Sequence, residues 1–180
     1  MSNFLGRSEL SRGLRNNNPG NLVKTNNKWI GKILNGTDIR FEQLTEVKYG
    51  LRAMMIDIVG DIGKGKNTLR KLISEYAPAF ENDTKAYVNS VAKGVGISPD
   101  TLIKEVDFLF IHKLSRAIIT HENGVKDGSL ITDSDIFDAI DIIDRKELNG
   151  VVINTKKNFK YNVYIIPVVL FFFTVFTITL

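Results

Sequence analysis

A glutamate at the end of an otherwise apolar helical stripe is the strongest candidate for chemistry in this 180-residue chain. Helical spacing places four residues on one face of the segment that follows Ser98: Ile111, Leu114, Ile118 and Glu122. Burial opposes the charge of Glu122, and so does the negative end of the helix dipole beside it. Both effects favour the protonated acid, which can protonate the leaving oxygen of a glycosidic bond. The alternative is an ordinary exposed glutamate in a frayed last turn.

An asparagine-rich segment before this helix could hold the substrate. Residues 15–22 read RNNNPGNL, and a proline, a glycine and short amides predict a shaped polar loop. Amide side chains match the hydroxyl and N-acetyl groups of sugars, and an aromatic ring offers a face for a sugar ring. Alternatively, the amides bind their own backbone and the tryptophan belongs to the core. The candidate substrate-binding residues are Asn16, Asn17, Asn18, Asn21, Trp29 and Tyr49.

A second carboxylate would distinguish two mechanisms. An inverting hydrolase needs one to activate water, whereas in a lytic transglycosylase the substrate's own hydroxyl attacks and a single acid/base suffices. The carboxylates that surround Phe41 are Asp38, Glu42 and Glu46, and we expect most of them to be solvated. The residues therefore leave the choice between hydrolase and transglycosylase open.

Several motifs resemble a family of phage virion and prophage proteins described as structural proteins or as peptidoglycan-cleaving, lysozyme-like enzymes. They are RGLRNNNPGNL from Arg12, WIG from Trp29, FEQ from Phe41, YGLRAM from Tyr49, APAFENDT from Ala77 and HENG from His121. The resemblance implies cleavage of the β-1,4 bond between N-acetylmuramic acid and N-acetylglucosamine, with Glu122 as general acid. The match at FEQ makes Glu42 the preferred second catalytic residue.

The motifs are also distantly similar to the flagellar and autolysin glucosaminidases. In those enzymes the acid glutamate precedes the asparagine loop, whereas in this chain HENG follows the loop. A circularly rearranged version of the same site would explain the changed order.

The hydrophobic pattern predicts a mainly α (α+β) domain with a C-terminal transmembrane helix, and the resemblance implies that this domain is lysozyme-like. Helices are expected over 48–62, 68–76, 84–92, 98–122 and 127–144, with a small hairpin over 22–41. The predicted organisation is a peptidoglycan-cleaving domain over 1–150, a basic linker over 151–160 and an anchor over 161–180.

The anchor is predicted from an uncharged run. Residues 163–180 are 18 residues without a charge, and a bilayer takes roughly 20 apolar residues. Three lysines precede the run, so the positive-inside rule would keep the domain on the cytoplasmic side of the producing cell's membrane. A pair of apolar core strands is the alternative, because the run is rich in β-branched and aromatic residues.

Composition excludes some classes of site and partner. The chain has no cysteine and two histidines, so neither disulfides nor a Cys/His zinc site is possible, and no metal or cofactor is expected. The net charge of +4 owes most to three lysines after residue 155, and the nearly neutral remainder argues against nucleic-acid binding. The expected partners are peptidoglycan glycan strands, a lipid membrane and capsid proteins.

The sequence leaves three functional classes open. The preferred one is a phage virion enzyme, a lytic transglycosylase or muramidase, in the internal membrane of the virion and in the host inner membrane during assembly. The segment 1–13 has no apolar core of the kind that a secretory signal needs, so export would take another route. The second class is a non-catalytic virion membrane protein that binds peptidoglycan or links capsid to membrane. The third is a holin-like or envelope protein.

Overall fold

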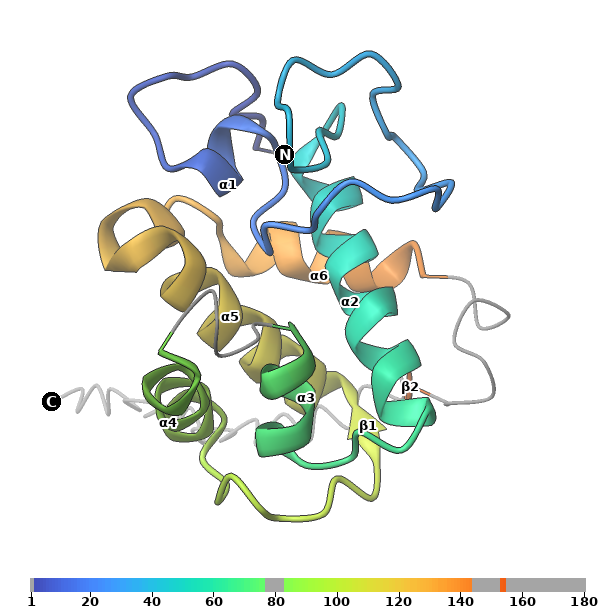
Figure 1. The fold of residues 1–180 in the computed structure, drawn as a ribbon, viewed down its shortest axis with the longest axis vertical. Helices are drawn as coiled ribbons and strands as arrows, with labels where there is room; N and C mark the ends of the chain where they lie inside the picture. The colour runs from blue at the N-terminus through green and yellow to red at the C-terminus, as the bar shows by residue number, and fades with distance from the viewer. Residues whose placement is uncertain (1, 77–82, 144–152, 155–180) are drawn as a thin grey trace, which may run out of the picture.

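The computed structural model describes residues 2–76, 83–143 and 153–154, and this part is mainly helical (Figure 1). Its helices are α1 (Arg12–Arg15), α2 (Val47–Gly63), α3 (Leu69–Tyr76), α4 (Thr84–Val95), α5 (Phe108–Gly128) and α6 (Asp133–Asp141). Strands β1 (Val106–Asp107) and β2 (Ile153–Asn154) form a short parallel pair in which Val106 lies opposite Ile153. The predicted mainly helical class is confirmed.

Side-chain caps set the starts of the later helices. Asp83 accepts a hydrogen bond from the Ala86 N–H at the start of α4, and Thr132 forms a capping box with Asp135 at the start of α6. Asp107 accepts from the Phe110 N–H and begins α5. The prediction that this helix begins near Ser98 is therefore wrong, because the cap lies at Asp107 and the residue before it pairs with β2.

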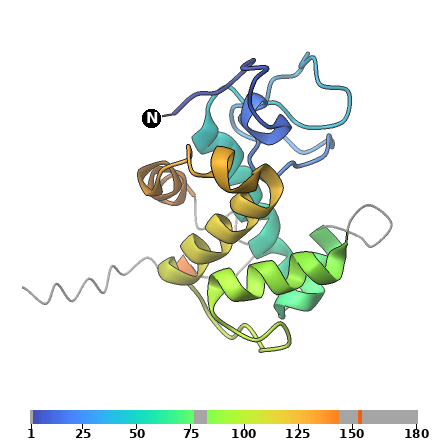
Figure 2. The same cartoon turned by 90° about the vertical axis from the view of Figure 1, so that its left-hand side faces the viewer.

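Two long helices, α2 and α5, run between two groups of elements. Residues 2–46, which we call the loop lobe, gather at one end with α1, and α3 and α4 lie at the other end (Figures 1 and 2). Helix α4 packs against α5, and α6 packs against α2. The predicted apolar stripe of α5 is confirmed, since the residues that share it are fully buried: Ile111, Leu114 and Ile118.

The loop lobe contains little regular structure. The expected hairpin is reduced to two isolated antiparallel bridges, Val23 to Phe41 and Lys32 to Leu44. Most of the lobe is instead held by side-chain amides and carboxylates that bind backbone groups, as described below. Such bonds compete with strand pairing, which explains why the expected hairpin is reduced to isolated bridges.

The predicted C-terminal transmembrane helix requires correction. No helix in the described ranges combines the length and the apolar composition needed to cross a membrane. Helix α5 has 21 residues, but charged side chains such as Lys113 and Arg116 interrupt it. The segment predicted as the anchor, 161–180, lies outside the described residues, as does the linker apart from β2. The fold class is accordingly a mainly helical domain without a membrane-spanning helix among the described residues.

Two glycines of α2 provide a matched test of how the loop lobe seats on this helix. A Cβ on Gly50 would lie 1.9 Å from the Asn17 carbonyl oxygen, whereas a Cβ on Gly60 would meet no atom within 4 Å. We expect Gly50→Ala to lower the free energy of unfolding by about 2–3 kcal/mol, because backbone must move to relieve the clash. Gly60→Ala should raise it by about 0.5–1 kcal/mol through helix propensity. Chemical denaturation followed by circular dichroism measures both, and equal effects of the two changes would contradict this account.

Candidate active site

Glu122 lies at a break in α5. The helix is interrupted at Gly124, whose φ of 73° and ψ of 165° are non-helical, and then continues to Gly128. The predicted helix end at Asn123 and Gly124 therefore corresponds to this break. Glu122 itself is half-buried and occupies the last turn before it.

The break brings Glu122 against the asparagine loop. Asn21 donates from Nδ2 to Oε2 of Glu122 at 2.8 Å, across 101 residues of sequence. Asn21 has a positive φ of 50°, a conformation that asparagine tolerates better than most residues. Of the four candidate asparagines, Asn21 is the one whose amide contacts the candidate acid.

Two tyrosines from α3 and α4 complete the surroundings of Glu122. The Tyr76 hydroxyl donates to the Gly20 carbonyl, and the Tyr87 ring stacks on His121 with centroids 3.6 Å apart. Burial raises the pKa of both phenols well above the usual value, and the nearby charge of Glu122 raises these pKa values further. Both phenols therefore stay protonated beside the carboxylate.

Two polar atoms without a hydrogen-bond partner lie close to Glu122. Within the described residues, three buried side-chain atoms have no hydrogen-bond partner: Asn21 Oδ1, the Tyr87 hydroxyl and Ser115 Oγ. The first belongs to the residue bound to Glu122, and the second is close enough for the Glu122 charge to influence it. Buried polar atoms are rarely left unpaired, and such atoms often mark a site that binds a ligand or water.

Asn123 positions the loop against the helix break. Its Nδ2 donates to the Pro19 carbonyl at 2.8 Å and to the Ile119 carbonyl at 3.0 Å, and its Oδ1 accepts from the Ser11 hydroxyl at 2.8 Å. A Cβ on Gly13 would lie 2.3 Å from that Oδ1, so the approach requires glycine. The predicted helix ends at residue 122, so Asn123 was not among the predicted site residues. Its position beside Glu122 in HENG was the available signal for a larger role.

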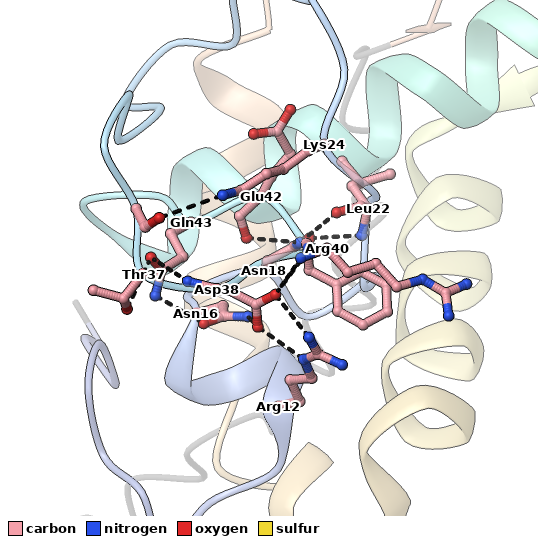
Figure 3. A network of polar contacts seen from close by, with 12 residues as sticks. Arg12, Asn16, Asn18, Leu22, Lys24, Thr37, Asp38, Arg40, Glu42 and Gln43 are labelled. Atoms are coloured by element: carbon pink, nitrogen blue, oxygen red, sulfur yellow. Dashed lines mark hydrogen bonds and ion pairs between the residues drawn. The ribbon is translucent and has the colours of Figure 1, made fainter.

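The three consecutive asparagines serve the loop lobe itself. All are buried, at 0–2% exposure. The Asn16 amide binds Asp38 and Gln43, and the Asn18 amide binds Leu22 and Glu42 (Figure 3). The Asn17 amide binds Asn3, Phe4 and Leu44. With every amide engaged, the three side chains shape the loop that presents Asn21.

Glu42, the predicted second catalytic residue, lies in the loop lobe and is 1% exposed. Its Oε1 accepts from Lys32 Nζ at 2.8 Å and from the Thr25 N–H at 3.0 Å. The structure does not bring its carboxylate to Glu122, whose recorded hydrogen bond is to Asn21. The expectation that most of Asp38, Glu42 and Glu46 are solvated is wrong, because the carboxylates of Asp38 and Glu42 are buried and paired with Arg12 and Lys32.

The two aromatic candidates lie elsewhere. Trp29 packs partly against the core and lines a hollow with Arg52 and Asp57. Tyr49 lies against Gly31, and Lys48 Nζ is 4.8 Å from the centre of its ring. Neither ring joins the cluster of Asn21, Tyr76 and Tyr87 around Glu122. In the described part of the chain, no group of three or more metal-binding side chains is found.

Comparison with known proteins shows that this chain is similar to a phage protein. Protein P5 of Pseudoalteromonas phage PM2 is 31% identical over 121 residues, which are 65% of this chain and 74% of P5. The chain belongs to the family of phage PM2 Protein P5. The predicted phage character is thereby confirmed, while the P5 name states no activity. No protein-family model matches the chain, and the resemblance to peptidoglycan-cleaving enzymes stays a prediction.

The ion pair between Asp38 and Arg12 gives the loop lobe a testable pH dependence. Arg12 contacts both Asp38 oxygens at 2.8 Å, and the backbone N–H groups of Arg40 and Phe41 also donate to Asp38. The Arg12 guanidinium, with these donors, holds the pKa of Asp38 well below its ordinary value of 3.8. A lowered pKa stabilises the fold above that ordinary value, and the stabilisation is lost as the pH falls below it.

We therefore expect Asp38→Asn to lower the free energy of unfolding by about 1–3 kcal/mol at pH 7, and the difference from wild type to narrow below about pH 4. Urea denaturation at pH 7 and pH 3 measures the free energy of unfolding of both proteins. Asp100→Asn, which breaks the exposed pair of Asp100 with Arg70, is the matched control and should change stability little. A pH-independent loss at Asp38 would contradict the electrostatic explanation.

Proposed function

We propose that this phage protein cleaves the glycan strands of peptidoglycan, with Glu122 as the general acid. One observation carries the proposal: a half-buried carboxylate at a helix break is oriented by an amide from a loop 101 residues earlier. An enzyme that protonates a leaving oxygen needs a carboxyl group in a fixed position and partly removed from water.

The surroundings of Glu122 suit that chemistry. The bond from Asn21 to Oε2 fixes the plane of the carboxyl group and leaves Oε1 to transfer the proton. Asn21 Oδ1 and the Tyr87 hydroxyl are the unpaired polar atoms beside it, and we propose that they bind hydroxyl or N-acetyl groups of the sugar. The protonated phenols add no negative charge beside Glu122.

We further propose the lytic transglycosylase reaction. Glu122 is bound by the amide of Asn21 and acts electrostatically on Tyr76, Tyr87 and His121, and Glu42 is bound to Lys32. Without a second carboxylate to activate water, Glu122 protonates the glycosidic oxygen as the bond to the anomeric carbon breaks. The resulting carboxylate then accepts the proton of the muramic acid C6 hydroxyl, which attacks the same carbon and closes a 1,6-anhydro ring.

Such an activity would serve a phage when it crosses the host cell wall. We propose that the protein is carried in the virion and opens peptidoglycan during entry. A non-catalytic virion protein that keeps the same fold for binding peptidoglycan is the competing proposal, and the experiment below separates the two.

Glu122→Gln should abolish release of sugar fragments from purified peptidoglycan by the full chain in mild detergent. Glutamine keeps the size of the side chain and the contact with Asn21 but cannot donate the acidic proton. We expect a loss of at least about 10³-fold in rate, since the acid is the central catalytic group. Mass spectrometry of the products measures the rate and detects the anhydro ring.

Two further variants provide controls. Glu75→Gln removes an exposed carboxylate of α3 and should leave release unchanged. Glu42→Gln should lower stability through the lost pair with Lys32 while the folded fraction keeps its activity. Binding of peptidoglycan without release by any variant or by wild type would support the non-catalytic protein, and equal release by wild type and Glu122→Gln would assign the acid to another residue.

A further inference from the structure

The hollow lined by Trp29 lies between the loop lobe and α2 and has a volume of about 320 Å³. Trp29 and Lys28 line it from the loop lobe, and Arg52, Asp57 and Lys64 line it from α2 and the residue that follows this helix. Small-molecule sites begin at roughly 300 Å³, so this hollow is large enough for one compact group.

The hollow is separate from the Glu122 site. A Cβ on Gly20 would lie 2.8 Å from Met54 Cγ and Sδ, so Met54 faces the asparagine loop. Successive residues of a helix are rotated by about 100°, which puts Arg52 and Ile56 on the opposite side of α2 from Met54. Helix α2 therefore separates the Arg52 side of the hollow from the asparagine loop, while Asp57, about 60° around the helix from Met54, lines the part of the hollow nearer that loop.

Asp57 is the unusual group in this hollow. Its carboxylate is half-buried, and it makes no hydrogen bond or ion pair with any residue that the structure describes. Burial raises the pKa of Asp57, and the neighbouring charge of Asp61 raises this pKa further against the opposing effect of Lys64 and Lys66. Keeping a carboxylate here costs folding free energy, and the charges of Lys64 and Lys66 offset that cost only in part.

The other lining groups suggest what Asp57 binds. An acceptor-only carboxylate near an indole ring favours an ammonium group. Three cations line the same hollow: the buried Arg52 guanidinium, which donates to the Ile142 carbonyl at 3.3 Å, and the exposed Lys28 and Lys64. These cations would repel a simple amine but attract a ligand that also carries a carboxylate.

We infer that this hollow binds an α-amino-acid head group, with its ammonium at Asp57 and its carboxylate on the side of Arg52, Lys28 and Lys64. Two sources carry this chemistry: a free amino acid, and the uncrosslinked diaminopimelate end of a cell-wall peptide. The inference does not depend on cleavage by Glu122, because no residue that lines the hollow belongs to the cluster of Asn21, Tyr76 and Tyr87 around Glu122.

Trp29 is the only tryptophan in the chain, so its fluorescence reports on this hollow directly. We expect a saturable change when the full chain is titrated with alanine or with free diaminopimelate. N-acetylalanine lacks the ammonium and alanine methyl ester lacks the carboxylate, so each should bind at least about ten times more weakly, or not at all. If a tripeptide that ends in diaminopimelate binds more tightly than the free amino acids, the natural ligand is a cell-wall peptide. If the free amino acids bind more tightly, the natural ligand is a free amino acid.

Asp57→Asn separates a binding role from a structural one. The variant should bind the zwitterions at least about ten times more weakly, while its melting temperature at pH 7 equals or exceeds that of wild type, because a desolvated charge has been removed. Asp138→Asn, which changes a half-buried carboxylate of α6 outside the hollow, should leave the titration unchanged. The inference is overturned if no probe changes the fluorescence, if N-acetylalanine binds as well as alanine, or if Asp57→Asn binds as wild type does.

Discussion

The bonds made by Asn123 hold the two halves of the candidate site together. One amide side chain binds the carbonyl of Pro19 in the asparagine loop, the carbonyl of Ile119 in α5 and the hydroxyl of Ser11 at the start of α1. Pro19 and Ser11 lie more than a hundred residues before Asn123 in the sequence. A buried amide that lost its partners would cost about 1–3 kcal/mol for each group. Asn21 meets Glu122 because Asn123, the residue immediately before the break of α5 at Gly124, fixes the loop at that point.

The loop lobe shows how a segment almost without strands can still be ordered. Its buried polar side chains satisfy backbone groups that a sheet would otherwise pair, as Asn18 does for Leu22 and Glu42. Glu42 and Asp38 are buried carboxylates in the same lobe, and each has a cationic partner in Lys32 or Arg12. Since every such group needs its partner, the lobe depends on a network rather than on a large apolar core.

Helix α2 separates two different environments. Its Gly50 and Met54 side packs against the asparagine loop, and its Arg52 and Ile56 side lines the hollow with Trp29. The first side is closely packed, as a Cβ on Gly50 would overlap the Asn17 carbonyl. The hollow also contains the Asp57 carboxylate, which has no direct partner in the described chain. Proteins retain such locally unfavourable groups where they bind ligands.

Hydrophobic periodicity and turn chemistry act over a few residues, so the sequence alone determines features of that range. These features are the helical character of the chain, the apolar stripe that ends at Glu122 and the irregular course of residues 15–22. The local pattern did not locate the start of α5, where the cap at Asp107 overrode an equally plausible one at Ser98. It also predicted a transmembrane helix that has no counterpart among the described helices. Only the tertiary structure decided that Asn21 touches Glu122 while Asn16, Asn17 and Asn18 support the loop, and that Trp29 faces a different hollow. Those outcomes depend on which distant segments pack together, and spacing along the chain carries no information about such contacts.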